Sequence, residues 1–270
     1  MNQPIANFIA IGDPAIWVEA TGSGPAVVFL HAGIADSRMW DAEVKALRDT
    51  HQVVRLDLRG WGRSQLVPGT FSYYGDVLAV LDALKITRAT LVGCSFGSNV
   101  ALDVAVSHPE RVERLVLISP SIGDGDESLE IREFGNREEE ALERGDLDGA
   151  TEENVRFWVV GPRRSRSDVD PKVCRLVFDM QRQAFDNPIP EGMTLQRLDP
   201  PARERLEEIR VPTLIVVGDL DVEHVRRVAE RLKERIPGAR VEVMKGTAHV
   251  PTLEKSAEWL ELLRGALGLL

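Results

Sequence analysis

The sequence predicts an α/β protein with an eight-stranded, mostly parallel sheet and helices on both of its faces. Short apolar runs alternate along the chain with segments whose apolar residues recur at helical spacing, which is typical of strand–helix–strand units. The run at residues 26–30 is continuously apolar, as expected for a strand that is buried on both faces of a parallel sheet. A chain of 270 residues is long enough to form one such domain around a large core.

The first part of the chain supplies six of the predicted strands. Gly12-Asp13-Pro14 is the predicted turn between the first two. Ser37 is the predicted N-cap of the first helix, whose apolar residues lie on one face. The predicted strands are 8–11, 15–20, 26–30, 52–56, the apolar run that leads into Ser95, and 114–119. The predicted helices are 38–49, 72–84 and the segment that follows Ser95.

The alternation of strands and helices stops at Pro120 and resumes after Arg205. We expect no strand in between, where residues 124–153 carry thirteen acidic side chains in a helical pattern. The other helices expected in this segment are 152–160, 169–184 and 202–209. Strands at 212–217 and 240–244 and helices at 222–236 and 252–267 then complete the pattern. The sequence therefore predicts a core domain of residues 1–120 and 206–270, with residues 121–205 inserted as a helical cap.

The charge balance restricts the partners that we expect. The chain has 33 basic and 43 acidic side chains and a net charge of −10, which disfavours nucleic acid and anionic membranes. No apolar run approaches transmembrane length, and the first residues lack a secretion-signal pattern, so we expect no membrane association and a cytoplasmic location. Cys94 and Cys174 form no disulfide framework, which fits a reducing compartment. A homodimer stays open as an assembly state.

Residues 93–97 read Gly-Cys-Ser-Phe-Gly between an apolar run and a helical pattern. A Gly-x-Ser-x-Gly turn from strand to helix holds the serine in a strained conformation and exposes its hydroxyl. Strand and helix come close at such a turn, so a bulky residue at Gly93 or Gly97 would clash. The helix that follows directs unpaired N–H groups toward charge that develops beside Ser95. Ser95 is therefore the candidate nucleophile.

Two further polar residues follow strand ends at the same edge of the predicted sheet, where function collects in parallel α/β sheets. His249 follows the last strand and is the candidate base, which takes the Ser95 proton and returns it to the leaving group. Asp221 follows the preceding strand and is the candidate acid that holds the imidazole tautomer. Asp219 stays an alternative for the acid.

A serine nucleophile also needs N–H donors for the transient oxyanion. The candidates are the N–H of Phe96, directly after the nucleophile, and that of Gly33, in the loop after the third strand. The sequence contains no phosphate loop, dinucleotide fingerprint or metal-ligand cluster, so we expect no cofactor and no metal.

Five motifs occur in a characteristic order and spacing. They are His31-Ala32-Gly33, Asp57-x-x-Gly-x-Gly-x-Ser64, Gly93-x-Ser95-x-Gly97, Gly218-x-x-Asp221 and Gly246-Thr-Ala-His249-Val-Pro251. Together they make nearly the whole chain resemble the α/β-hydrolase superfamily. The stretch 35–40 and the overall layout are similar to bacterial 3-oxoadipate enol-lactonases and small-ester hydrolases. The resemblance implies a serine hydrolase that cleaves a small-molecule ester or lactone through an acyl-enzyme. Because some members of this superfamily place the acid after the sixth strand, the resemblance also makes Asp124 an alternative for the acid.

The same residues leave two other functions open. One is carbon–carbon bond hydrolysis or perhydrolysis on the same triad, and the other is a ligand receptor with little turnover. The substrate pocket is expected between core and cap. Its expected lining residues are Ile34, Trp40, Phe157, Trp158 and Val250. The basic run Arg163-Arg164-Ser165-Arg166 is interpreted as an exposed loop.

Overall fold

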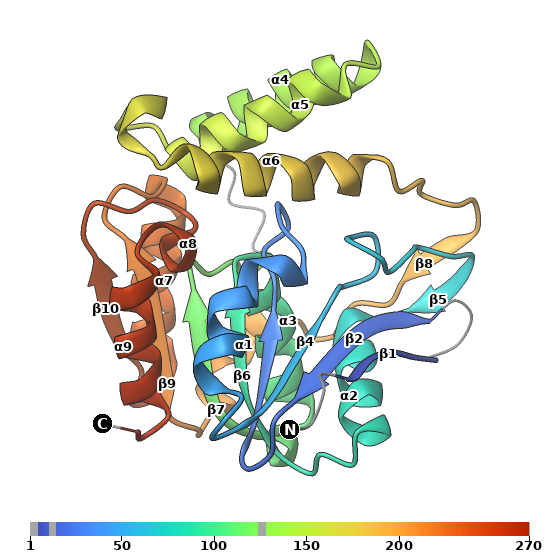
Figure 1. The fold of residues 1–270 in the computed structure, drawn as a ribbon, viewed down its shortest axis with the longest axis vertical. Coiled ribbons are helices and arrows are strands. Elements are labelled where there is room, and N and C mark those ends of the chain that lie inside the picture. Colours follow the sequence, from blue (N-terminus) through green and yellow to red (C-terminus); the bar gives the residue numbers. More distant parts are fainter. Residues whose placement is uncertain (1–4, 11–14, 124–127, 270) are drawn as a thin grey trace.

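The computed structural model describes residues 5–10, 15–123 and 128–269 (Figure 1). The predicted turn at residues 12–14 lies outside this part of the chain. Eight strands of the described residues form the central sheet: β1 Ile5–Ile9, β2 Ile16–Thr21, β3 Ala26–Leu30, β4 Gln52–Leu56, β6 Ala89–Cys94, β7 Val112–Ile118, β9 Thr213–Gly218 and β10 Arg240–Met244.

These strands lie in the order β1-β2-β4-β3-β6-β7-β9-β10. β2 runs antiparallel to both of its neighbours, β1 and β4, whereas every other neighbouring pair is parallel. The predicted α/β fold class is therefore confirmed. Because the strands from β4 to β10 are parallel, their carboxyl ends meet at one edge of the sheet.

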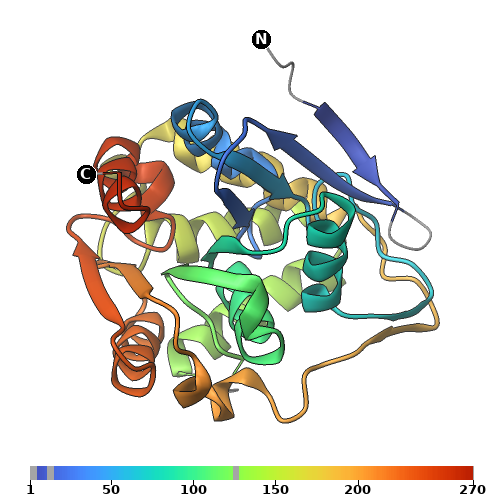
Figure 2. The same cartoon turned by 90° about the horizontal axis from the view of Figure 1, so that it is seen from below.

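Helices cover both faces of the sheet, and the alternation of side chains along each strand explains why. In β3, Val28 and Leu30 belong to the core layer on one face, and Val27 and Phe29 belong to the layer on the other. The first layer is completed by α2 Tyr73–Ala83, α3 Phe96–Ser107 and α7 Glu223–Arg235. The second is completed by α1 Asp41–Leu47 and α9 Ser256–Ala266, as Figure 2 shows from below.

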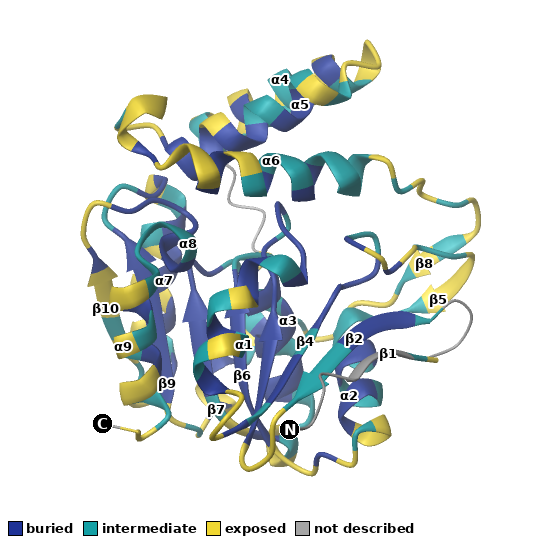
Figure 3. Cartoon of the chain, viewed as in Figure 1, coloured by how far each residue is buried: buried dark blue, intermediate teal, exposed yellow. Residues whose placement is uncertain are grey.

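The segment after β7 contributes three long helices above the carboxyl edge of the sheet (Figure 1). They are α4 Leu129–Glu143, α5 Leu147–Asn154, which continues into the π-helical turn Val155–Val160, and α6 Pro171–Phe185. Figure 3 shows exposed residues along these helices, while the central strands beneath them, such as β6 and β9, are buried. No helix in the described part of the chain is long and apolar enough to cross a membrane.

Two short strands differ from the prediction. β5 Gly69–Phe71 and β8 Met193–Leu195 pair in parallel as a separate two-stranded sheet, so the expectation of no strand between 120 and 205 was wrong. Each strand has only three residues, too few for an alternating pattern to stand out. Their hydrogen-bond partners also lie more than a hundred residues apart in the sequence, where local patterns carry no signal.

The helix predicted at 202–209 is also different in the structure. Two 3₁₀ turns, Ala202–Glu204 and Leu206–Glu208, replace it. Arg205 interrupts the helix between them with φ −124° and ψ 17°. Its guanidinium donates to the Val106 carbonyl of α3 and pairs with Glu208.

Candidate active site

Ser95 occupies the sharp turn between β6 and α3. It has a positive φ of 50°, which an L-residue adopts only when its surroundings enforce it. The two flanking glycines permit the close approach of strand and helix. A Cβ on Gly93 would lie 2.3 Å from the Gly97 carbonyl oxygen, and one on Gly97 would lie 2.2 Å from the Leu30 carbonyl oxygen. The turn therefore has the strained geometry that the sequence motif predicts.

The structure brings Ser95, His249 and Asp221 into one hydrogen-bonded chain. The Ser95 Oγ lies 2.8 Å from Nε2 of His249. On the other side of the ring, Nδ1 lies 3.0 and 3.1 Å from the two carboxylate oxygens of Asp221. A carboxylate only accepts, so Nδ1 carries the proton and Nε2 offers its lone pair to the serine hydroxyl. His249 and Asp221 are both buried, whereas Ser95 is partly exposed.

The three candidate acids have different positions. Asp221 faces His249, and its Oδ1 also accepts the Val222 N–H at 2.8 Å. Asp219 points elsewhere: its Oδ1 accepts the Gly246 N–H at 2.6 Å and so connects the two loops that leave β9 and β10. Asp124 lies outside the described residues. Among the described alternatives, Asp221 alone contacts the histidine.

Gly33 lies next to Phe96, the residue that follows Ser95. A Cβ on Gly33 would lie 3.7 Å from the Phe96 Cβ. The Gly33 carbonyl accepts a hydrogen bond of 2.6 Å from the Trp61 indole N–H, which fixes the orientation of this loop. Within the described residues, the N–H groups of Gly33 and Phe96 donate no hydrogen bond to another protein group. Both donors are available to a ligand oxygen.

His31 is a buried structural residue of the same loop. Its Nδ1 donates to the Ala32 carbonyl at 2.8 Å, and its Nε2 accepts the Leu58 N–H at 2.9 Å. Burial lowers the pKa of this imidazole, in keeping with a neutral ring. Both ring nitrogens are therefore engaged, which leaves His249 as the histidine that faces Ser95.

The five predicted pocket residues lie in different environments. The Trp158 ring stands 4.4 Å from the His249 ring, measured between centroids. Phe157, in the π-helical turn, stacks on Phe134 of α4 at 4.5 Å between ring centroids. The other three are buried in the core layer that contains α1 and α9: Ile34, Trp40 and Val250.

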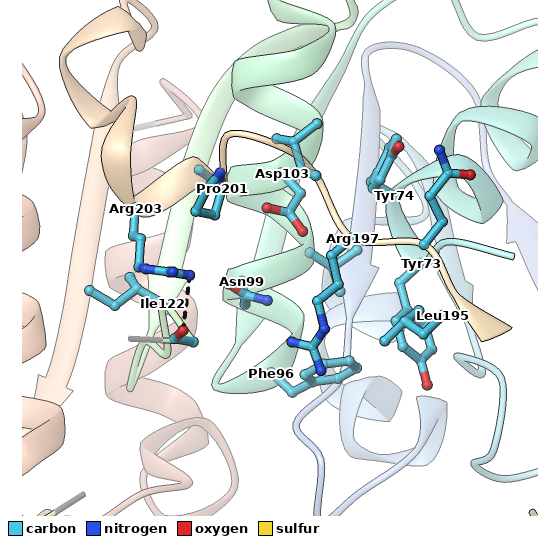
Figure 4. A pocket seen from close by; sticks show the side chains of 15 residues that line it. Tyr73, Tyr74, Phe96, Asn99, Asp103, Ile122, Leu195, Arg197, Pro201 and Arg203 are labelled. Atoms are coloured by element: carbon cyan, nitrogen blue, oxygen red, sulfur yellow. Dashed lines mark hydrogen bonds between the residues drawn. The ribbon is translucent and has the colours of Figure 1, made fainter. Parts of the chain in front are cut away.

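A cavity of about 130 Å³ lies beside Phe96 and is lined by none of these five residues (Figure 4). Phe96, Asn99 and Asp103 line it from successive turns of α3, and Arg197 lines it from the segment after β8. Burial raises the pKa of Asp103 to about 6. The sequence pattern gives no sign of this cavity, because its outer wall is an irregular segment without helix or strand periodicity.

The prediction that residues 163–166 form an exposed loop was wrong for Arg164. The side chain of this residue is only 7% exposed and forms an ion pair with Glu254, so the basic run 163–166 is not uniformly an exposed loop. Its neighbours Arg163 and Arg166 are exposed, as predicted. Among the described residues, no three His, Cys, Asp or Glu side chains are grouped so that they could hold a metal ion.

The chain is similar to known hydrolases over most of its length. A family model described as the alpha/beta hydrolase family matches residues 27–262. The 3-oxoadipate enol-lactonase 1 of Acinetobacter baylyi is 25% identical over 254 residues, which cover 93% of this chain and 91% of the relative. The pimeloyl-[acyl-carrier protein] methyl ester esterase of Aeromonas hydrophila is 26% identical and covers 94% of this chain and 100% of the relative.

Solved structures give the same result. Est816, described as an N-acyl homoserine lactone degrading enzyme, superposes with a TM-score of 0.73 at 28% identity, covering 94% of this chain and 98% of its own. The enol-lactonase from Burkholderia xenovorans has the same fold, with a TM-score of 0.79 at 23% identity over 97% of this chain and 100% of its own. The chain belongs to the alpha/beta hydrolase family.

Proposed function

We propose that this chain is a cofactor-independent serine hydrolase that cleaves a small carboxylic ester or lactone through an acyl-enzyme. The hydrogen-bonded chain from Ser95 through His249 to Asp221 carries this proposal. Ester hydrolysis is also the activity named for the relatives, which include a lactonase and a methyl ester esterase.

The proposed reaction begins with attack of the Ser95 Oγ on the carbonyl carbon of the substrate. His249 takes the hydroxyl proton at Nε2, and Asp221 stabilises the imidazolium that forms. The carbonyl oxygen becomes an oxyanion and accepts the N–H groups of Gly33 and Phe96. As the carbon–oxygen bond to the alcohol breaks, the Nε2 proton passes to the departing oxygen. Water then repeats the sequence and releases the acid.

We assign one part of the substrate to the cavity beside Phe96. The cavity holds about 130 Å³, and its lining combines apolar and polar side chains, including Asn99, Asp103 and Arg197. A small group with polar atoms suits this lining better than a long hydrocarbon chain. We therefore expect short-chain esters and functionalised lactones to be better substrates than long-chain esters.

We further propose that residues 121–205 act as a cap on a core of residues 1–120 and 206–270. Helices α4, α5 and α6 lie over the carboxyl edge that carries Ser95 (Figure 1). Trp158 from this segment packs against His249, and Arg197 reaches the cavity beside Phe96. The cytoplasm is the proposed location, because Cys94 and Cys174 are both free thiols.

Turnover of p-nitrophenyl acetate, butyrate and octanoate by the wild type and by Ser95→Ala tests the proposed function. We expect the wild type to hydrolyse the esters, with kcat/KM falling from butyrate to octanoate. Ser95→Ala should lower kcat by several powers of ten while its unfolding temperature stays close to that of the wild type.

Near-wild-type activity of the Ser95→Ala protein would exclude this serine as the nucleophile. If the wild type bound esters and lactones but turned over none of them, the protein would instead be a receptor with a hydrolase fold.

A further inference from the structure

Arg164 connects the cap to the loop that carries His249. Its Nε donates to the Val160 carbonyl at 2.6 Å, and its Nη2 donates to the Val159 carbonyl at 2.7 Å. Nη1 reaches across to the Gly246 carbonyl at 3.1 Å. Nη2 also pairs with Oε2 of Glu254 at 2.6 Å, and both side chains of this pair are 7% exposed. One buried guanidinium thus binds backbone carbonyls in both the cap and the core.

Glu254 extends this connection to the residue next to the histidine. Its second oxygen, Oε1, accepts the Ala248 N–H at 2.8 Å. The loop between β10 and the short helix α8 Pro251–Glu254 is therefore held at two points, the Gly246 carbonyl and the Ala248 N–H. His249 follows directly after the second point, so the pair limits how far its backbone can move.

The cap also contacts His249 itself. The His249 N–H donates to the Trp158 carbonyl at 3.3 Å, and the Trp158 ring packs on the imidazole. Trp158 immediately precedes the two carbonyls that Arg164 holds. The chain then passes close to the histidine loop, since a Cβ on Gly161 would lie 3.1 Å from the Ala248 Cβ. Arg164 therefore fixes the part of the cap on which the histidine rests.

We propose that Arg164 and Glu254 are positioning residues for His249, and that through them the cap completes the catalytic triad. This inference rests on the proposed serine hydrolase function. The imidazole must stay within hydrogen-bond reach of both Ser95 and Asp221, yet it lies on a loop without regular secondary structure. A displacement of about 1 Å at a reacting group can cost on the order of 100-fold in rate.

Two variants separate positioning from simple stabilisation. Arg164→Met removes all four contacts and leaves a buried carboxylate without its cation, which should lower the unfolding temperature. In Arg164→Met/Glu254→Gln, the glutamine still accepts the Ala248 N–H and no buried charge is left unpaired. The double variant should therefore regain most of the lost stability. It still lacks the guanidinium that holds the Val159 and Val160 carbonyls, so its kcat should stay low.

The experiment measures kcat, KM and the rate at which a fluorophosphonate modifies Ser95, each per titrated active site. We expect Arg164→Met and the double variant Arg164→Met/Glu254→Gln to lose about 100-fold in kcat and in phosphonylation rate, with a much smaller change in KM. Arg164→Lys should recover part of the rate, since an ammonium can pair with Glu254 but cannot reproduce the planar fork. Arg166→Met is the matched control, because Arg166 is exposed and pairs with Glu152 inside the cap.

Wild-type kcat and phosphonylation rates in Arg164→Met and in the double variant would overturn the positioning role. So would a kcat in the double variant that recovers in parallel with its unfolding temperature, because the pair would then act on stability alone. An active Ser95→Ala protein is a separate result, which removes the proposed function itself.

Discussion

At the scale of single residues, the site combines a serine in a strained conformation with a buried, hydrogen-bonded histidine and aspartate. Ser95 is held at positive φ by a turn that two glycines permit. Its hydroxyl faces Nε2 of His249, the ring nitrogen whose lone pair can accept the hydroxyl proton. The opposite nitrogen donates to Asp221, which is 1% exposed. Burial strengthens this contact, because little water competes for the carboxylate. The tautomer of His249 is therefore set by a single carboxylate.

Replacement of the Asp221 carboxylate should impair catalysis. Asp221→Asn should lower kcat by roughly 10⁴, because an amide can stabilise the wrong imidazole tautomer and cannot balance the imidazolium charge. Asp219→Asn is the matched control, since its amide oxygen can still accept the Gly246 N–H. Kinetics on p-nitrophenyl butyrate with both variants make the comparison. The reverse order would make Asp219 the acid, and little effect from either would direct attention to Asp124.

The candidate site residues could be inferred from sequence where a short motif ends a strand. Gly93 to Gly97, Asp221 and His249 all follow predicted strands, so the topology alone brings them to one edge. Arg164 could not be placed in this way. A basic run has the composition of an exposed loop, and only the tertiary approach of Glu254 shows that one of its side chains is buried.

At the scale of elements, a buried carboxyl group joins α1 to α9. Glu43 is 1% exposed, and its Oε1 accepts the Trp259 indole N–H at 2.6 Å. Among the described residues, its other oxygen, Oε2, has no hydrogen-bond partner. Burial raises the pKa of Glu43 from 4.5 to about 7. The protonated side chain therefore suits this helix contact better than the ionised one.

This contact predicts a specific pH dependence of stability. Between about pH 5 and 7 the unfolded chain releases the Glu43 proton while the folded chain keeps it, so the free energy of unfolding falls as pH rises. The loss is complete above pH 7 and amounts to about 3 kcal/mol for a shift from 4.5 to about 7. Glu43→Gln still accepts the Trp259 N–H but cannot ionise, so it should lack this decrease.

Urea denaturation of both proteins from pH 5 to pH 8 measures the difference. The stability of Glu43→Gln relative to the wild type should increase across this range. A constant difference would mean that Glu43 ionises as readily in the folded protein as in the unfolded chain.

The same scale explains which elements escaped prediction. Strands β3, β6 and β9 are buried runs of five or six residues, and such runs stand out in a sequence. β5 and β8 pair only with each other, and neither has a sequence pattern that predicts a strand. Residues 202–209 have a helical composition, but the structure has two 3₁₀ turns there, separated at Arg205, whose side chain contacts α3. Where tertiary contacts outweigh local preference, the sequence pattern is misleading.

At the scale of the whole molecule, the parallel sheet gathers three loops at one edge and the inserted helices cover that edge (Figure 1). The inserted helical segment contacts the histidine loop at two points, because the Trp158 carbonyl accepts the His249 N–H and Arg164 donates to the Gly246 carbonyl. The core and the cap are therefore expected to act as one unit in catalysis.

The most direct test of the central claim, that Ser95 is the nucleophile of a hydrolase, is mass spectrometry after treatment with a fluorophosphonate. The account predicts one adduct per chain, located on Ser95, with esterase activity lost in proportion to labelling and no adduct in Ser95→Ala. An adduct on another residue that abolishes activity, or full activity after complete labelling of Ser95, would contradict it.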